Sequence, residues 1–266
     1  MRIRSAGHAV FAATMIALGI MGLIKGNFAP MWDGVPKDLP GRAVLAYLSA
    51  VVSLACGIGL FWKRTAAIAA CVLLVTILLW FLLFKLRYII AAPLVEGSYQ
   101  NCGETVAMLA GAWVLFDWFA GGWNMRRLGF AIGETGLRIA RALYALALIA
   151  FGLSHFDYLD LTAPLVPGWL PAHVFWAYFT GAAYLAAGAA ILLGVVVRLA
   201  AVLAAWQIGL ITLLVWVPIV AAGPNAFQWS ETVLSWAITT AAWVIAESCR
   251  SIPWLAVNTF KQARMK

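Results

Sequence analysis

The chain contains 266 residues, of which 65% are hydrophobic and 11% are charged, and its mean hydropathy is +0.95. A soluble domain is nearer to half apolar and a quarter charged, so this composition excludes a water-soluble globular protein and predicts an integral membrane protein. The net charge of +8 does not predict nucleic-acid binding, because the basic residues lie between apolar runs rather than on one surface.

Apolar segments long enough to cross a bilayer, which takes roughly 20 residues, recur along the chain. Eight are predicted as spanning helices: 7–24, 42–62, 65–84, 104–123, 139–154, 172–196, 199–220 and 231–247. We interpret the first as a retained helix rather than a signal peptide, because its apolar run is long and no small-residue cleavage site closes it. The predicted fold class is therefore all-α, a polytopic membrane protein with eight transmembrane helices.

The basic residues predict the orientation of these helices. With the N-terminus inside, 13 of the 18 lysines and arginines fall in inner segments and 5 in outer ones. The outer residues are Lys25, Lys37, Arg42, Lys85 and Arg87. Positive charge resists translocation, so we expect a protein of the inner (plasma) membrane with both termini cytoplasmic.

The two halves of the chain follow the same plan, which indicates an internal repeat. The matched residues are Gly22 with Gly152, Tyr47 with Tyr178, Gly57 with Gly188, Arg64 with Arg198, Ala66-Ala67 with Ala200-Ala201, and Glu104 with Glu231. Each half has an even number of helices, so both enter the membrane from the same side and the repeat is parallel. The predicted units are a four-helix repeat at 1–123, a cytoplasmic linker at 124–138, a second four-helix repeat at 139–247 and a cytoplasmic tail at 248–266.

Small residues fill the second helix of each half, around Gly57 and Gly188. Helices associate in lipid by close packing, which small residues permit. We therefore expect these helices at the tightly packed centre of each bundle, with Gly57 and Gly188 in structural roles. The alternative is that the small residues line a ligand groove.

Glu104 and Glu231 are the strongest candidates for chemistry, since ionisable side chains at membrane depth are costly and are usually functional. Each could bind a proton or a cation, or accept a hydrogen bond from a polar ligand. The alternative is a structural role as a first-turn acid at a helix N-terminus, which the helix dipole favours. Asn101 and Ser230 would then be the helix caps.

A second candidate site lies around His155, Tyr178 and Trp176, which together offer an aromatic wall and hydrogen-bond donors for a quinone-like head group. Tyr47 is the first-half counterpart of Tyr178. His155 and His173 with nearby aspartates do not have the spacing of a known metal motif, so no metal site is predicted. Tryptophan and tyrosine also prefer the membrane interface, which is the structural alternative.

The helix that closes in GLSHF, the Pro-rich segment after it and the helix that ends in GVVVRLAA resemble the DoxX-like membrane proteins. The shared turn, G-x-x-x-R-x-A-A, comprises Gly194, Arg198, Ala200 and Ala201, with Arg64 in its first-half echo, so Arg64 and Arg198 are expected to be structural. Many family members carry an acid within the second helix, where this chain has Ser53 and Tyr184. The resemblance implies a four-helix unit and, in some members, a quinone-reducing redox subunit.

Three functions follow from these patterns. The first is the membrane subunit of a redox system with a quinone-like ligand and a soluble or membrane-bound redox partner. The second is a non-enzymatic scaffold or carrier for an exported peptide or lipid. The third is a proton-coupled transporter that uses Glu104 and Glu231. An oligomer is compatible with each of them.

Overall fold

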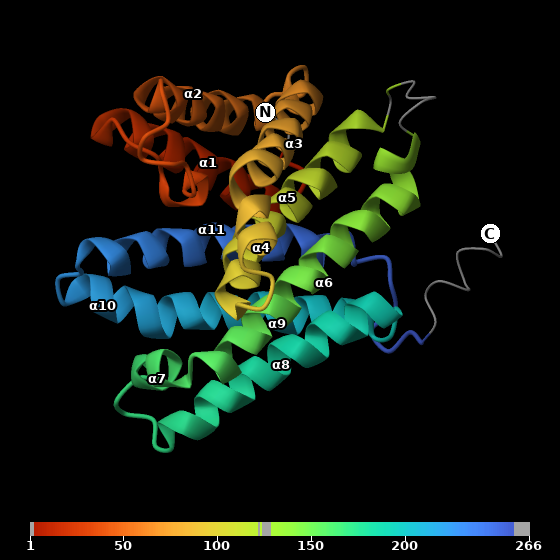
Figure 1. The fold of residues 1–266 in the computed structure, drawn as a ribbon. Coiled ribbons are helices and arrows are strands. Elements are labelled where there is room, and N and C mark those ends of the chain that lie inside the picture. The colour runs from red at the N-terminus through yellow and green to blue at the C-terminus, as the bar shows by residue number, and fades with distance from the viewer. Residues whose placement is uncertain (1–2, 122, 124–128, 258–266) are drawn as a thin grey trace.

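The computed structural model describes residues 3–121, 123 and 129–257, and every regular element within them is a helix, which confirms the predicted all-α class (Figure 1). The long uninterrupted helices are α1 (Ala6–Lys25), α2 (Arg42–Leu60), α5 (Glu96–Ala120), α6 (Gly133–Asp157), α8 (His173–Leu193) and α11 (Ala226–Ser248). The short elements are η1 (Pro30–Trp32), η3 (Gly129–Ala131), α7 (Leu159–Thr162) and η4 (Ala163–Leu165).

Two further long helices each contain a turn of π-helix. The first consists of α3 (Ala66–Trp80), η2 (Phe81–Lys85) and α4 (Leu86–Ala91). The second consists of α9 (Val197–Ile211), η5 (Thr212–Trp216) and α10 (Val217–Ala221). A π-turn leaves the backbone hydrogen-bonded but changes which side chains share a face, and such turns are frequent at functional sites.

Six of the described helices are long and apolar enough to cross a membrane: α1, α2, α3 to α4, α6, α8 and α9 to α10. Among the described helices, α5 and α11 do not meet this criterion. These two helices contact each other, and each also contacts several of the surrounding helices. A helix surrounded by protein can carry polar side chains that would be costly against lipid, which explains the lower hydropathy of this pair.

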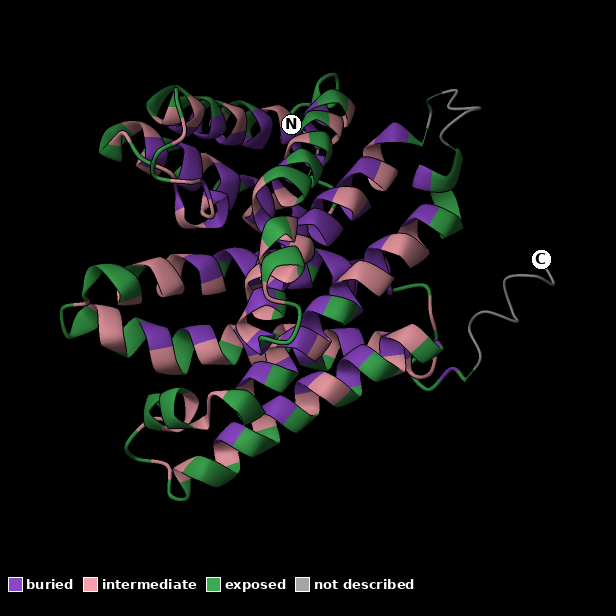
Figure 2. Cartoon of the chain, in the orientation of Figure 1, coloured by how far each residue is buried: buried purple, intermediate pink, exposed green. Residues whose placement is uncertain are grey.

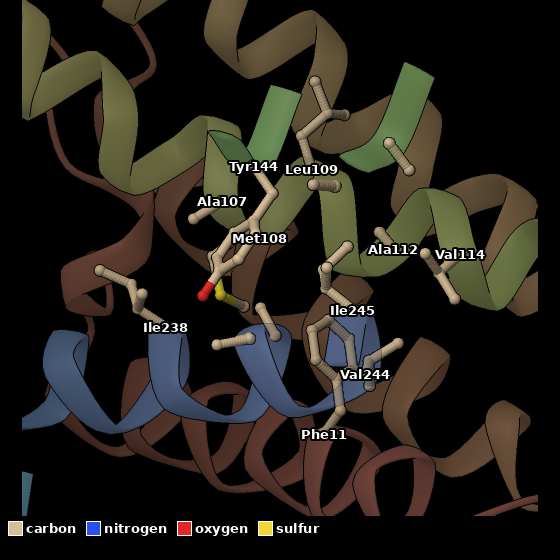
Figure 3. Packing of buried hydrophobic residues seen from close by; sticks show 14 of the residues in the cluster. Phe11, Ala107, Met108, Leu109, Ala112, Val114, Tyr144, Ile238, Val244 and Ile245 are labelled. Carbon is tan, nitrogen blue, oxygen red and sulfur yellow. The ribbon is translucent and has the colours of Figure 1, made fainter. Parts of the chain in front are cut away.

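One hydrophobic core runs through the molecule where α5 and α11 meet, and Figure 2 shows buried residues concentrated there. Phe11 of α1 and Tyr144 of α6 are fully buried and approach the α5–α11 contact from their own helices (Figure 3). They lie in this core with Met108 of α5 and with Ile238 and Ile245 of α11. Both halves of the chain therefore contribute to the same core.

Glycines allow α1 to approach α2, and α6 to approach α8. A Cβ added at Gly57 would lie 2.8 Å from the carbonyl oxygen of Ala12, and one at Gly188 would lie 2.7 Å from that of Ala145. Gly57 and Gly188 therefore each lie at a close approach between two helices.

The glycine matched with Gly152 is a different one from that predicted. A Cβ on Gly152 would meet Gly181 and Leu185 of α8, and one on Gly19 would meet Ala50 and Leu54 of α2. The equivalent of Gly152 is thus Gly19 and not Gly22, because helix contacts rather than loop lengths fix the register.

The positions of the π-turns also do not support the predicted match of Arg64 with Arg198. The two π-helix-containing segments begin at Ala66 and Val197 and enter their π-turns at Phe81 and Thr212. In this register Arg198 corresponds to Ala67, and Ala69-Ala70 correspond to Ala200-Ala201, all four of which are buried. Arg64 is exposed, whereas the Arg198 guanidinium lies over the ring of Trp254 at 4.1 Å and donates to the Ile252 carbonyl at 3.4 Å.

Three helices begin earlier than predicted, at Glu96, Gly133 and Ala226. Glu104 therefore lies more than two turns inside α5, and Glu231 more than one turn inside α11. The cap of α11 is Asn225, whose side chain forms a capping box with Gln228, and the cap position of α5 is Val95. The interpretation of the two glutamates as first-turn acids capped by Asn101 and Ser230 is thus wrong.

Candidate functional site

The side chain of Lys85 is fully buried, although its helix is apolar enough to cross a membrane. Lys85 ends the π-helix η2, in which the N–H of Leu86 donates to the carbonyl of Phe81. The extra residue in this turn rotates the following side chains relative to an α-helix. Ile77, Trp80 and Lys85 consequently share the buried face, and the lysine enters the bundle.

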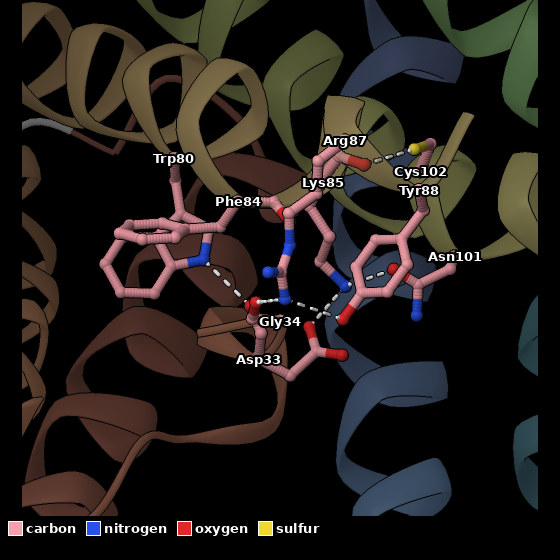
Figure 4. Close-up of polar contacts among 9 residues, drawn as sticks. All are labelled: Asp33, Gly34, Trp80, Phe84, Lys85, Arg87, Tyr88, Asn101 and Cys102. Carbon is pink, nitrogen blue, oxygen red and sulfur yellow. Dashed lines mark hydrogen bonds and ion pairs between the residues drawn. The ribbon is translucent and has the colours of Figure 1, made fainter. Parts of the chain in front are cut away.

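The Lys85 ammonium group has two partners, one on α5 and one in the loop after η1. Nζ donates to Oδ1 of Asn101 at 2.9 Å and forms an ion pair with Asp33 (Figure 4). Asp33 keeps 45% of its side chain exposed, whereas Lys85 has none exposed. The lysine is therefore the desolvated member of the pair, and its burial depends on these partners.

The loop that carries Asp33 folds back into the bundle. Nε1 of the buried Trp32 donates to Oγ of Ser53 on α2 at 2.8 Å, and Nε1 of Trp80 donates to the carbonyl of Asp33 at 3.0 Å. Gly34, the residue after Asp33, accepts a hydrogen bond at its carbonyl from Nη2 of Arg87 at 2.7 Å. Non-helical backbone is tolerated at membrane depth only when protein satisfies its polar groups. These contacts hold Asp33 against Lys85.

Glu104 of α5 and Glu231 of α11 lie beside this ion pair. Both are half-buried, and both interact electrostatically with Lys85 and Asp33; Glu104 also interacts with Glu231. Lys85 thus has one carboxyl group in an ion pair, that of Asp33, and two further carboxyl groups that interact with it electrostatically. An excess of negative charge away from bulk water favours the binding of a positive ligand, and the smallest such ligand is a proton. We call Asp33, Lys85, Asn101, Glu104 and Glu231 the Lys85 cluster.

Aromatic rings form one wall next to the Lys85 cluster. The ring of Trp80 lies 5.5 Å from that of Phe28, 5.0 Å from that of Trp32 and 4.8 Å from that of Phe84, measured between centroids. Edge and tilted contacts at these distances are favourable aromatic geometries. The rings bring apolar surface directly beside the carbonyl of Asp33.

The quinone-site residues predicted from the sequence lie elsewhere, on α6 and α8. His155 Nδ1 donates to the carbonyl of Phe151 at 2.8 Å, and its ring lies 5.6 Å from that of Tyr184. Tyr178 is 41% exposed and contacts Phe156, while Trp176 contacts Phe175 and Phe179.

Tyr47 on α2 is exposed, with its hydroxyl group next to Gly26. Glu231, in contrast, interacts with Asp33 and Lys85. The described residues include no group of three or more His, Cys, Asp or Glu side chains placed to hold a metal ion.

Sequence reasoning identified Glu104 and Glu231 but missed Lys85, Asp33 and Asn101. Lys85 lies just beyond the predicted end of the third span and was counted as an outer charge. The helix continues to Ala91, so the signal was a lysine inside an apolar run longer than a bilayer requires. Asp33 had no such signal, because only the folded loop brings it to α3.

No protein-family model, curated protein or solved structure matches this chain. The DoxX-like resemblance therefore stays a prediction that rests on its short motifs. The geometry of the Lys85 cluster is the stronger guide to function.

Proposed function

We propose that the chain crosses the inner (plasma) membrane eight times as two parallel four-helix repeats, with both termini in the cytoplasm. The contacts between helices support this arrangement. α1 contacts α2, α2 contacts α3, and α3 contacts α5; in the second half α6 contacts α8, α8 contacts α9, and α9 contacts α11. The fourth helix of each half then contacts the first helix of the other, as α5 with α6 and α11 with α1.

The position of α5 and α11 supports their inclusion as spans. They contact each other at the centre of the bundle, so their polar residues face protein rather than lipid. The two π-turns at equivalent places, Phe81–Lys85 and Thr212–Trp216, support the repeat independently of hydropathy. A pseudo-twofold axis along the membrane normal would pass through the α5–α11 contact.

The function that this geometry favours is proton-coupled transport of a small solute, with the Lys85 cluster as the proton-binding site. One observation carries the proposal: a fully buried lysine is ion-paired with an aspartate of a loop, and a glutamate on each of the two central helices interacts with this pair electrostatically. Intramembrane acids and bases that face the bundle interior are characteristic of proton relays. A proton taken up by Glu104 or Glu231 would reduce the excess negative charge around Lys85.

Infrared spectroscopy of the protein in liposomes tests proton binding without knowledge of the solute. We expect the carbonyl band of protonated carboxyl groups to titrate with pH, and to lose most of its amplitude in Glu104→Gln/Glu231→Gln. Asp160→Asn is the matched control, because Asp160 is an exposed acid on α7. An unchanged band in the double variant would refute the assignment.

Transport itself is tested with a pH dye enclosed in the same liposomes, to which a panel of small solutes is added. A solute that wild-type protein carries should move protons, and the double variant should abolish this movement. Transport that persists after both glutamates are changed would remove the proposal.

A second candidate function is the quinone-linked redox subunit that the DoxX-like resemblance implies. It is favoured by the aromatic wall of Phe28, Trp32, Trp80 and Phe84 beside polar groups, and by His155 next to Tyr184. The test is extraction of quinone from purified protein and quinone reduction with its redox partner. Absence of quinone from the extract, together with no effect of His155→Ala on reduction, would count against it.

A further inference from the structure

A second ionisable pair lies at the opposite end of the bundle from the Lys85 cluster, where α1 begins and α11 ends. His8 is fully buried there. Its Nε2 contacts the carbonyl of Leu60 at 3.1 Å, and its Nδ1 accepts from the backbone N–H of Arg4 at 3.3 Å. Because a carbonyl only accepts and an N–H only donates, these contacts fit a neutral imidazole with its proton on Nε2.

Glu247 of α11 is the acid next to His8, with which it interacts electrostatically. Its side chain is 4% exposed; Oε1 accepts from Arg250 at 3.1 Å, but the buried Oε2 has no hydrogen-bond partner. Gly7 leaves room for this oxygen, since an added Cβ there would lie 2.7 Å from it. A buried carboxylate oxygen without a partner is costly, so a donor beside it would be strongly held.

The other half of the chain has a different residue at the equivalent place. In the register set by the glycine contacts, in which Gly19 matches Gly152, His8 corresponds to Arg141. Arg141 forms an ion pair with Glu134 at 3.7 Å and donates to the hydroxyl group and the carbonyl of Ser248 on α11. Arg141 is always charged, whereas histidine can change its charge near neutral pH. Of these two basic residues, only His8 can therefore change its charge near neutral pH.

We propose that His8 and Glu247 form a second proton-binding site at the α1–α11 contact. A proton added to Nδ1 would point at the Arg4 N–H, which is also a donor. Uptake of this proton therefore replaces the contact of Nδ1 with Arg4 by a hydrogen bond to Oε2 of Glu247. The product is an imidazolium–carboxylate pair at the place where the second half has the permanent cation of Arg141, which forms an ion pair with Glu134. A role of this site in transport, as the proton-binding site at the cytoplasmic end of the bundle, rests on the proposed function. Its ability to bind a proton does not.

The groups that face His8 come from every element around it. Phe61 follows α2, and Phe119 of α5 lies edge-on with its centroid 5.0 Å away. Arg4, before α1, is bound to the carbonyl of Trp118. The other charged groups near this end of the bundle are Glu247 and Arg250 at the end of α11, Asp117 of α5, and the exposed Lys63 and Arg64 beyond Leu60. Glu247 is the acid that interacts electrostatically with His8, so it determines whether the added proton is held.

Nitrogen NMR of protein labelled with ¹⁵N-histidine in lipid nanodiscs tests the site directly, because the chain has only 3 histidines. His8→Gln assigns the His8 signal, and His173→Gln assigns an external reference. We expect His8 to gain a proton on Nδ1 as the pH falls. In Glu247→Gln its titration midpoint should drop by about 1 pH unit, the smaller end of what a close opposite charge contributes.

Arg250→Gln provides a second variant that leaves both members of the site in place. Arg250 competes for the Glu247 carboxylate and is itself mostly exposed, so its removal should raise the His8 midpoint. A His8 signal that stays neutral at every pH at which the protein remains folded would overturn the proposal. Midpoints that do not move in either Glu247→Gln or Arg250→Gln would also overturn it.

The two proposals fail separately. His8→Arg imitates Arg141 and should hold the pair in its charged form, whereas His8→Gln should hold it neutral. If the Lys85 cluster shows no proton binding while His8 titrates as described, the proposed function fails and the His8 site stands. If the cluster binds protons but His8 does not titrate, only the inner site is lost.

Discussion

The ion pair between Asp33 and Lys85 yields the sharpest energetic prediction, because its two members differ in burial. Removal of one partner from a buried pair typically costs about 3–5 kcal/mol. Asn101 would still bind Lys85 at 2.9 Å, and Glu104 and Glu231 lie nearby, so we expect Asp33→Asn to cost about 2 kcal/mol. Lys85→Met should cost less than about 1 kcal/mol, since the half-exposed Asp33 can hydrate.

The double variant distinguishes this explanation from simple loss of packing. In the Asp33→Asn background the buried ammonium group has lost its ion-pair partner, so Lys85→Met should then stabilise the protein. Thermal unfolding in detergent, followed by tryptophan fluorescence at one scan rate, is the assay. A loss of about 2 kcal/mol corresponds to a Tm lower by about 4–8 °C at this chain length. A double variant less stable than Asp33→Asn alone would refute the reasoning.

Three other predictions concern packing, the Asp33 loop and orientation. Gly188→Ala should destabilise the α6–α8 contact by about 1–3 kcal/mol, because its Cβ would lie 2.7 Å from a backbone oxygen, while Gly168→Ala, with open space around it, should be neutral in the same unfolding assay. Trp32→Phe leaves the buried Ser53 without its indole donor and should lower stability by about 1–2 kcal/mol. The control Trp206→Phe, at an exposed site, should change Tm little. Equal effects of the two variants would contradict the described loop contacts. In a cysteine-free background, Arg64→Cys should react with an impermeant thiol reagent only from the cytoplasmic side and Asp160→Cys only from the outside; the reverse pattern would overturn the orientation.

The sequence by itself determined the helical class and the apolar segments, because 65% hydrophobic residues and runs of bilayer length allow few other folds. It also identified Glu104 and Glu231, since acids near long apolar runs are conspicuous. It placed the start of α5 wrongly, because the polar residues at 96–101 resemble a loop, whereas they form the first turns of a helix that begins at Glu96.

Only the tertiary structure decided which polar groups meet. Asp33 lies on a loop that has no helical period, and Lys85 enters the bundle because a π-turn changes the face of its helix. The equivalence of Gly19 with Gly152 likewise comes from backbone approaches between helices. Hydropathy is a property of each segment and can be read from the sequence. The register of a repeat and the partners of a buried charge depend on contacts between segments, and these contacts cannot be read from the sequence.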